Sequence, residues 1–89
     1  SVMVYKRKGK EDADDVLVIL NATPEPRYDW VIETYGKEYT KEIFNSDAKS
    51  FYGTGDVFNK DIRSECLEAD QKKYRITVNL PPLAGLILK

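Results

Sequence analysis

Apolar and polar side chains alternate along much of this chain, which is the pattern of strands with one face in a core. The clearest stretch is residues 74–80, where every second side chain is apolar. Tyr28, Trp30 and Ile32 repeat the alternation, and Val2 and Val4 begin it at the N-terminus. Each stretch predicts an antiparallel strand whose polar side faces solvent.

Two continuous apolar runs, residues 16–20 and residues 86–88, predict two further strands. A run of this kind is typical of a central strand that is covered on both faces. Residues 39–45 form a weaker candidate because Lys41 and Glu42 blur the alternation. The side chains that we expect in the core of these strands are Val18, Leu20, Ile76, Val78 and Leu86.

Turn-forming residues separate the predicted strands. They are the acidic segment 9–15, the two prolines of segment 23–27, Gly36, and the Pro81-Pro82 pair. Segment 46–73 has little periodicity, so we expect a long ordered loop with one short strand near residues 62–67. No window has apolar residues at helical spacing, which excludes a helix longer than about two turns. The pattern predicts an all-β protein, an antiparallel β-sandwich of the Greek-key type.

Composition limits the classes of function. The 89 residues are enough for one domain, residues 1–89, and the net charge of −1 lacks the positive field that nucleic-acid binding needs. The apolar runs are far shorter than the roughly 20 residues of a membrane-spanning helix. We therefore expect no nucleic-acid or membrane partner. We also expect a cytoplasmic location, because the single cysteine, Cys66, rules out an internal disulfide and no signal-peptide pattern opens the chain. Because the chain starts at Ser1 and Met3 lies in an apolar stretch, we expect a piece of a larger protein.

Candidate catalytic and metal-binding groups are few. The chain has no histidine, the commonest metal ligand and general base, and Cys66 has no partner for a disulfide. Asp47, Asp56, Asn59 and Asp61 could offer oxygen ligands, but their spacing does not match a calcium-binding loop. We predict no catalytic residue, no metal and no cofactor, and a buried or half-buried Cys66.

Three separate blocks carry a family resemblance. They are residues 16–24 with Arg27, residues 43–48 followed by 51–55 and Asn59, and residues 80–84 followed by 86–89. In order and spacing they resemble the C-terminal β-domain of bacterial 1,4-α-glucan (glycogen) branching enzymes, of the α-amylase superfamily. The resemblance covers nearly the whole chain. Ala22 and Thr54 depart from that pattern, where the family has Phe and Gly, as does the stretch 56–58.

The resemblance implies a parent enzyme with a catalytic (β/α)₈ barrel that precedes this domain. Such an enzyme cleaves an α-1,4 linkage and transfers the released chain to a 6-hydroxyl, which forms an α-1,6 branch. Its two catalytic carboxylates lie on the barrel, so none is carried over to this chain. The expected role is a non-catalytic domain that supports the barrel.

A carbohydrate-binding module with its own glucan site is the alternative, and exposed aromatic rings would distinguish the two. Trp30 is expected in the core or at a domain interface, whereas Tyr52 and Phe58 are expected to anchor the long loop by burying their rings. All three are candidates for glucan or inter-domain contact, and two or more coplanar exposed rings would favour glucan binding. In the loop, Asn45 and Asp47 should bond backbone amides, while Gly53 and Gly55 provide conformational freedom.

Overall fold

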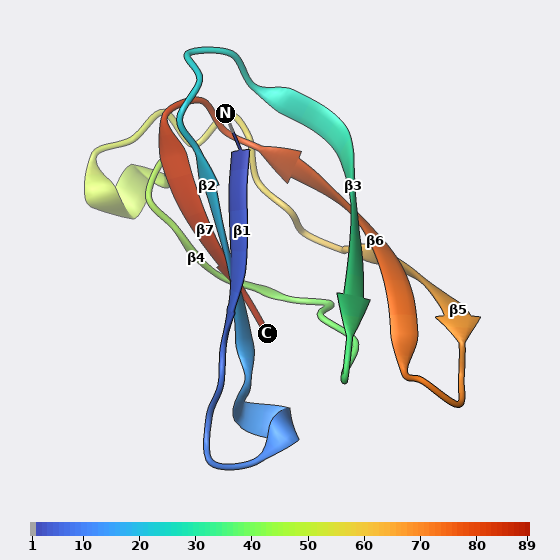
Figure 1. Cartoon of the computed structure of the whole chain (residues 1–89). Helices are drawn as coiled ribbons and strands as arrows, with labels where there is room; N and C mark the ends of the chain where they lie inside the picture. The colour runs from blue at the N-terminus through green and yellow to red at the C-terminus, as the bar shows by residue number, and fades with distance from the viewer. Residues whose placement is uncertain (1) are drawn as a thin grey trace.

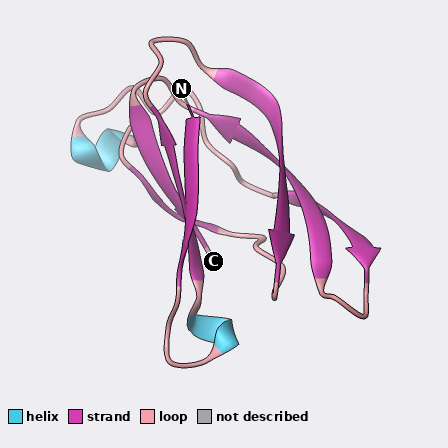
Figure 2. Cartoon of the chain, in the orientation of Figure 1, coloured by secondary structure: helices cyan, strands magenta, loops and turns pink. Residues whose placement is uncertain are grey.

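The computed structural model describes residues 2–89, except for the side chain of Asp12. Two 3₁₀ helices of three residues each, η1 (Asp12–Asp14) and η2 (Lys49–Phe51), are the helical elements of this part of the chain (Figure 2). The expectation of no long helix is thus confirmed for residues 2–89. The strands of this region are β1 (Val2–Arg7), β2 (Val16–Asn21), β3 (Arg27–Tyr35), β4 (Glu42–Asn45), β5 (Arg63–Glu68), β6 (Lys73–Leu80) and β7 (Ala84–Leu88).

These strands form two sheets that face each other (Figure 1). The four-stranded sheet has the order β1-β2-β7-β4, and the three-stranded sheet has the order β3-β6-β5. Every pair of neighbours is antiparallel. Four connections cross from one sheet to the other: β2 to β3, β3 to β4, β4 to β5, and β6 to β7. The predicted antiparallel β-sandwich of the Greek-key type is confirmed.

The core lies between the sheets and consists of side chains from alternate strand positions. Its members are Leu17, Ile19, Ile32, Tyr39, Ile62, Ile76, Val78, Leu80, Leu86 and Leu88. Ile76, Val78 and Leu86 were predicted correctly. Tyr39 is fully buried although it precedes β4, which begins only at Glu42. The predicted strand 39–45 is therefore shorter than expected.

Two of the predicted core residues lie on the opposite side of β2. Leu17, Ile19 and Asn21 point into the sandwich, so Val18 and Leu20 point to the outer face of the four-stranded sheet. Val18 is buried there between its neighbours Tyr5 and Ile87. The prediction for Leu20 was wrong, since its side chain is 39% exposed. The apolar run predicted a strand covered on both faces, and residues 2–89 cover only one.

The start of β3 departs from simple alternation. Asp29 has a φ of 53°, and the register between β3 and β6 shifts between Arg27 and Trp30. This irregularity leaves Tyr28 exposed, while Trp30 shares a face with the buried Val78. The ring of Trp30 lies at the rim of the core and is still 36% exposed.

Cys66 corrects another expectation, because it is exposed rather than buried or half-buried. It lies on β5 opposite Tyr74, one pair beyond Ser64 and Ile76. The β5–β6 end of the three-stranded sheet projects beyond the four-stranded sheet (Figure 1). The side chain therefore has no opposing sheet to bury it.

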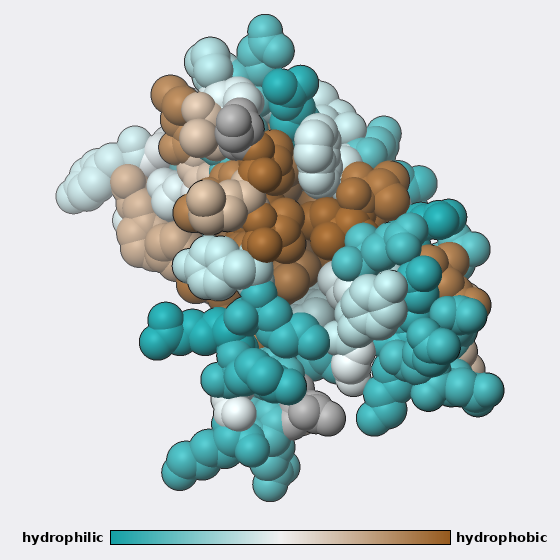
Figure 3. All heavy atoms as spheres, viewed as in Figure 1, coloured by the Kyte–Doolittle hydropathy of each residue, from teal (hydrophilic) through white to brown (hydrophobic). Residues whose placement is uncertain are grey.

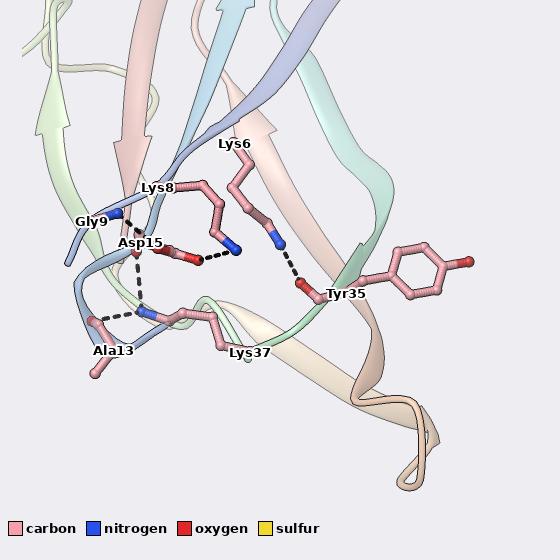
Figure 4. Close-up of polar contacts among 7 residues, drawn as sticks. All are labelled: Lys6, Lys8, Gly9, Ala13, Asp15, Tyr35 and Lys37. Atoms are coloured by element: carbon pink, nitrogen blue, oxygen red, sulfur yellow. Dashed lines mark hydrogen bonds and ion pairs between the residues drawn. The ribbon is translucent and has the colours of Figure 1, made fainter. Parts of the chain in front are cut away.

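A polar network joins the loops at the lower end of the four-stranded sheet (Figure 4). The buried Asp15 carboxylate accepts a hydrogen bond from the Gly9 amide at 2.8 Å. Lys37 Nζ donates to the carbonyl oxygens of Ala13 and Asp15, both at 3.2 Å. Lys6 Nζ donates to the Tyr35 carbonyl oxygen at 2.7 Å, which ties β1 to the end of β3. These contacts fix the conformation of the acidic turn, so the role of Asp15 there is structural.

Candidate functional site

The outer face of the three-stranded sheet is charged. Glu33, Arg75 and Glu65 lie side by side across its strands, with Arg75 nitrogens 3.7 and 3.9 Å from the two carboxylates. Lys73 Nζ lies 3.4 Å from Glu33, and Tyr35 first and Glu33 second raise the pKa of Lys73 above its usual value. These charged side chains are all partly accessible to water, so the face is suited to solvent.

The outer face of the four-stranded sheet is apolar. Strand register places Met3 beside Leu20, and Ile87 beside Phe44. Phe51 of η2 adds a ring whose centroid is 5.1 Å from that of Phe44. Arg7 is the one charged residue at the outward positions that register defines on this sheet. We call Met3, Tyr5, Leu20, Phe44, Phe51, Leu83 and Ile87 together the apolar face.

The exposure of the apolar face is unusual for a small domain. Met3 is 59% exposed, Phe51 54% and Leu83 69%. In the space-filling view, apolar atoms reach the margin beside the four-stranded sheet, those at the centre lie over the opening between β1 and β3, and hydrophilic atoms dominate the two lower protrusions (Figure 3). Contiguous exposed apolar area on a soluble domain commonly marks a surface that another molecule covers.

A depression of about 340 Å³ lies at one end of the apolar face. Gly85 lies at the level of Leu20 in the sheet, and a Cβ atom at position 85 would come within 3.0 Å of Leu20 Cδ2. Both polar side chains that line the depression make hydrogen bonds within the domain. Ser46 Oγ accepts from the Gly85 amide at 2.8 Å, and the side-chain amide of Asn21 donates to two backbone carbonyl oxygens. The depression is lined by Leu20, Asn21, Ala22, Ser46, Leu83, Ala84 and Gly85.

Asn21 fixes the segments around this depression. Its Nδ2 donates to the carbonyl oxygens of Pro81 at 3.0 Å and Glu25 at 3.1 Å. Its Oδ1 accepts from the Thr23 amide at 3.1 Å and the Thr23 hydroxyl at 2.6 Å. The amide of Leu83, a residue with a φ of 49°, donates a hydrogen bond to the Thr23 carbonyl oxygen at 2.9 Å. One buried side chain therefore joins the end of β2 to the turn before β7.

The loop that carries Phe51 has the structural contacts that the sequence predicted. Asn45 Oδ1 accepts from the Asp47 amide at 2.9 Å, and Asp47 Oδ1 accepts from the Thr54 amide at 3.2 Å. Gly53 packs directly on the backbone of Asp47, where a Cβ atom would overlap the carbonyl oxygen. The left-handed positions of the loop are Tyr52, with φ 63°, and Gly55, with φ 70°, so the departure at Thr54 causes no strain of that kind.

Trp30, Tyr52 and Phe58 come from three separate segments: β3, the residue after η2, and the loop before β5. Tyr52 and Phe58 do not bury their rings as expected, since Tyr52 is fully exposed and Phe58 is 58% exposed. Val57 and Asn59, on either side of Phe58, are the buried residues that anchor this part of the loop. The apolar face was not predicted from the sequence. The signal that could have identified it is the continuous apolar run of β2, because alternate residues of that run must point to the outer face of the sheet.

Within residues 2–89, apart from the undescribed Asp12 side chain, no group of three or more His, Cys, Asp or Glu side chains could hold a metal ion. Two of the oxygen ligands considered from the sequence have structural partners: Asp47 binds Thr54, and Asn59 binds Glu42 and Asn79. No helix among the described residues is long and apolar enough to cross a membrane.

Fold and surface together define a small antiparallel β-sandwich domain with one charged and one apolar outer face. A family model confirms this class and makes it specific. The chain belongs to the family described as alpha amylase, C-terminal all-beta domain, whose model matches residues 1–89.

Relatives along the whole chain agree with the family. The chain is 34% identical over 89 residues to the 1,4-alpha-glucan branching enzyme GlgB of Aquifex aeolicus, covering 100% of this chain and 14% of that enzyme. It is 38% identical over 88 residues to GlgB of Methylococcus capsulatus, covering 99% and 12%. For GlgB of Francisella tularensis strain SCHU S4 the identity is 34% over 89 residues, covering 100% and 14%. The chain therefore spans about one seventh or less of the length of these relatives.

Proposed function

We propose that this chain is the non-catalytic C-terminal domain of a glycogen branching enzyme, a single domain of a larger cytoplasmic protein. The observation that carries the proposal is the match of the whole chain, at 34–38% identity, to 12–14% of branching enzymes. The parent enzyme transfers α-1,4-glucan chains to 6-hydroxyls and so forms α-1,6 branches. It needs no cofactor for this chemistry.

Catalysis in the proposed parent takes place outside this domain. A retaining glycosyl transfer needs two carboxylates about 5 Å apart across the sugar ring, at the bottom of a cleft. In a (β/α)₈ barrel these groups lie on the loops at the C-terminal ends of the strands. The domain supplies none of them, and its role is to support the barrel by covering part of its surface.

A carbohydrate-binding module with its own glucan site is the second candidate. The exposure of Trp30, Tyr52 and Phe58 favours it, because flat exposed rings can stack on sugar units. These three rings come from separate segments, however, and the one close ring pair among the described residues, Phe44 and Phe51, is not a flat platform, since its planes are tilted by 48°. Supporting the barrel therefore remains the function with the stronger basis.

Two assays on the isolated domain separate these functions, and its own buried core makes it suitable for separate study. We expect no branching of amylose in an iodine-stain assay, because both catalytic carboxylates are on the barrel. We also expect unchanged mobility in native electrophoresis through a gel that contains glycogen. Measurable branching contradicts the proposal. Retardation that Tyr52→Ala or Trp30→Ala abolishes favours the binding module instead.

A further inference from the structure

The two outer faces of the sandwich differ in a way that the strand pattern alone does not require. Both sheets could present charged side chains outward, as the three-stranded sheet does with Glu33, Arg75 and Glu65. The four-stranded sheet instead presents Met3, Leu20 and Phe44. Because exposed apolar area has an unfavourable interaction with water, this sheet has the composition of a face that is normally covered.

From this contrast we infer that the apolar face is the surface on which the catalytic domain of the same polypeptide packs, with an apolar side chain of that domain seated in the depression between Leu20 and Leu83. The inference rests on the proposed function and specifies which surface performs it. It replaces the earlier candidates Trp30, Tyr52 and Phe58, which lie on three separate segments.

The path of the polypeptide favours this occupant over a separate protein. In a C-terminal domain the catalytic domain precedes β1, so the chain enters along the edge strand of the four-stranded sheet. Met3 and Tyr5, the outward residues of that strand, are part of the apolar face. The preceding domain is thus attached next to the surface, and attachment gives a high effective concentration for docking.

The chemistry of the depression favours an apolar occupant over a sugar. A sugar needs several free donors and acceptors, but the Asn21 side-chain amide is bonded within the domain, and the hydroxyl of Ser46, which already accepts from the Gly85 amide, is the one lining side chain with a polar group left to offer. Gly85 adds no side chain, which leaves room of about 340 Å³ in the depression. An aliphatic or aromatic side chain fits these conditions, and burial of such side chains in pockets is common at the centre of protein interfaces.

Cysteine labelling of the intact parent enzyme tests the inference. Met3→Cys, Phe44→Cys and Leu83→Cys each replace an exposed apolar side chain of the face, and maleimide labelling is followed for each peptide by mass spectrometry. We expect labelling at the three positions to be at least about tenfold slower in the intact enzyme than in the isolated domain. Cys66, which is exposed on the three-stranded sheet, is the internal control and should label equally fast in both.

Equal labelling of the three introduced cysteines in both proteins overturns the inference, and so does protection of Cys66 in their place. If the isolated domain forms dimers by sedimentation and the face is protected only at high concentration, the occupant is a second copy and the inference is wrong. Failure of the proposed function is a separate result, because it is measured by deleting the whole domain. If the parent enzyme loses stability when the domain is deleted but the three cysteines are not protected, the proposed function holds and only the assignment of the apolar face as the docking surface is wrong.

A matched pair of substitutions gives a second readout. Leu20→Ser removes an apolar side chain from the apolar face, and Val31→Ser removes one from the charged outer face of the three-stranded sheet. We expect Leu20→Ser to lower the thermal midpoint of the intact parent more than that of the isolated domain, while Val31→Ser changes both equally. Equal shifts for Leu20→Ser in the two proteins contradict the inference.

Discussion

Replacing Asn21 by Ala should destabilise the domain far more than replacing a typical polar residue. Asn21 is 2% exposed and makes four hydrogen bonds, two as donor and two as acceptor. The substitution leaves the buried carbonyl oxygen of Pro81 without a partner, which costs about 1–3 kcal/mol. The other three bonds are partly accessible to water and contribute about 0.5 kcal/mol each, at the low end of the usual range.

Together these losses give a decrease of about 2.5–4.5 kcal/mol in the free energy of unfolding. For a domain of this size each kcal/mol corresponds to roughly 4–8 °C, so the thermal midpoint should fall by about 10–35 °C. Urea denaturation followed by circular dichroism measures the change in free energy directly. The midpoint concentration should fall while the slope stays constant, because the buried surface is unchanged.

Asn79→Ala is the matched control for this prediction. The Asn79 side chain accepts one exposed hydrogen bond, from the Asp29 amide at 3.1 Å, so its removal should cost no more than about 1 kcal/mol. Equal and small losses for Asn21→Ala and Asn79→Ala would refute the reasoning, because the buried network would then contribute nothing beyond a surface contact.

Three further predictions concern the core, the loop and the charged face. Ile76→Ala should cost about 2–5 kcal/mol in urea denaturation, because Ile76 is fully buried between the sheets; an unchanged midpoint would contradict its core position. Gly53→Val should increase hydrogen exchange at the Gly55 amide far more than Asp47→Ala does, because the valine side chain would overlap the Asp47 backbone, whose carbonyl oxygen accepts from the Gly55 amide at 2.8 Å and is kept in Asp47→Ala; similar exchange in both variants would show that the close contact at Gly53 is not needed. The raised pKa of Lys73 stabilises the fold at pH values below the unfolded value near 10.5, and this contribution disappears as the pH rises through the folded value. Thermal midpoints of the unsubstituted domain and Lys73→Met should therefore converge at alkaline pH. A difference between the two midpoints that widens there would show that the pKa of Lys73 is not raised in the folded state.

Most of the fold was predictable because its strands have the period of two that a half-buried sheet requires. The stretch 74–80 is the best example: Ile76, Val78 and Leu80 are all buried, and the polar residues between them lie on the outer side. The hydrogen bonds of Asn45 and Asp47 were also predictable, since short polar side chains commonly bond nearby backbone amides in turns. Both predictions depend on local sequence.

The errors concern contacts that local sequence does not contain. Leu20 belongs to an apolar run, and such a run does not show whether its cover comes from this domain or from another. Tyr28 follows the alternation, but the irregularity at Asp29 shifts the register with β6 between Arg27 and Trp30, and Tyr28 falls inside that shift. Cys66 is exposed because the three-stranded sheet extends past its partner, which depends on the relative lengths of strands far apart in sequence.

The surface was harder to predict than the core for the same reason. Phe44 and Phe51 meet only because the loop after β4 turns back over the sheet through η2. Leu83 reaches the depression only because the turn at Thr23 holds its backbone in a left-handed conformation. Aromatic content alone therefore predicted Trp30, Tyr52 and Phe58 as contact residues, whereas strand register identifies the apolar face.

The central claim is that this domain supports the catalytic barrel of a branching enzyme, and deletion of the domain from the parent tests it most directly. The parent truncated before Ser1 is compared with the intact enzyme in soluble yield and thermal midpoint. We predict a lower yield and a lower midpoint, because the barrel surface that the domain covers becomes exposed to water. A truncated enzyme that stays soluble, keeps its midpoint and branches glucan at the full rate would contradict the claim.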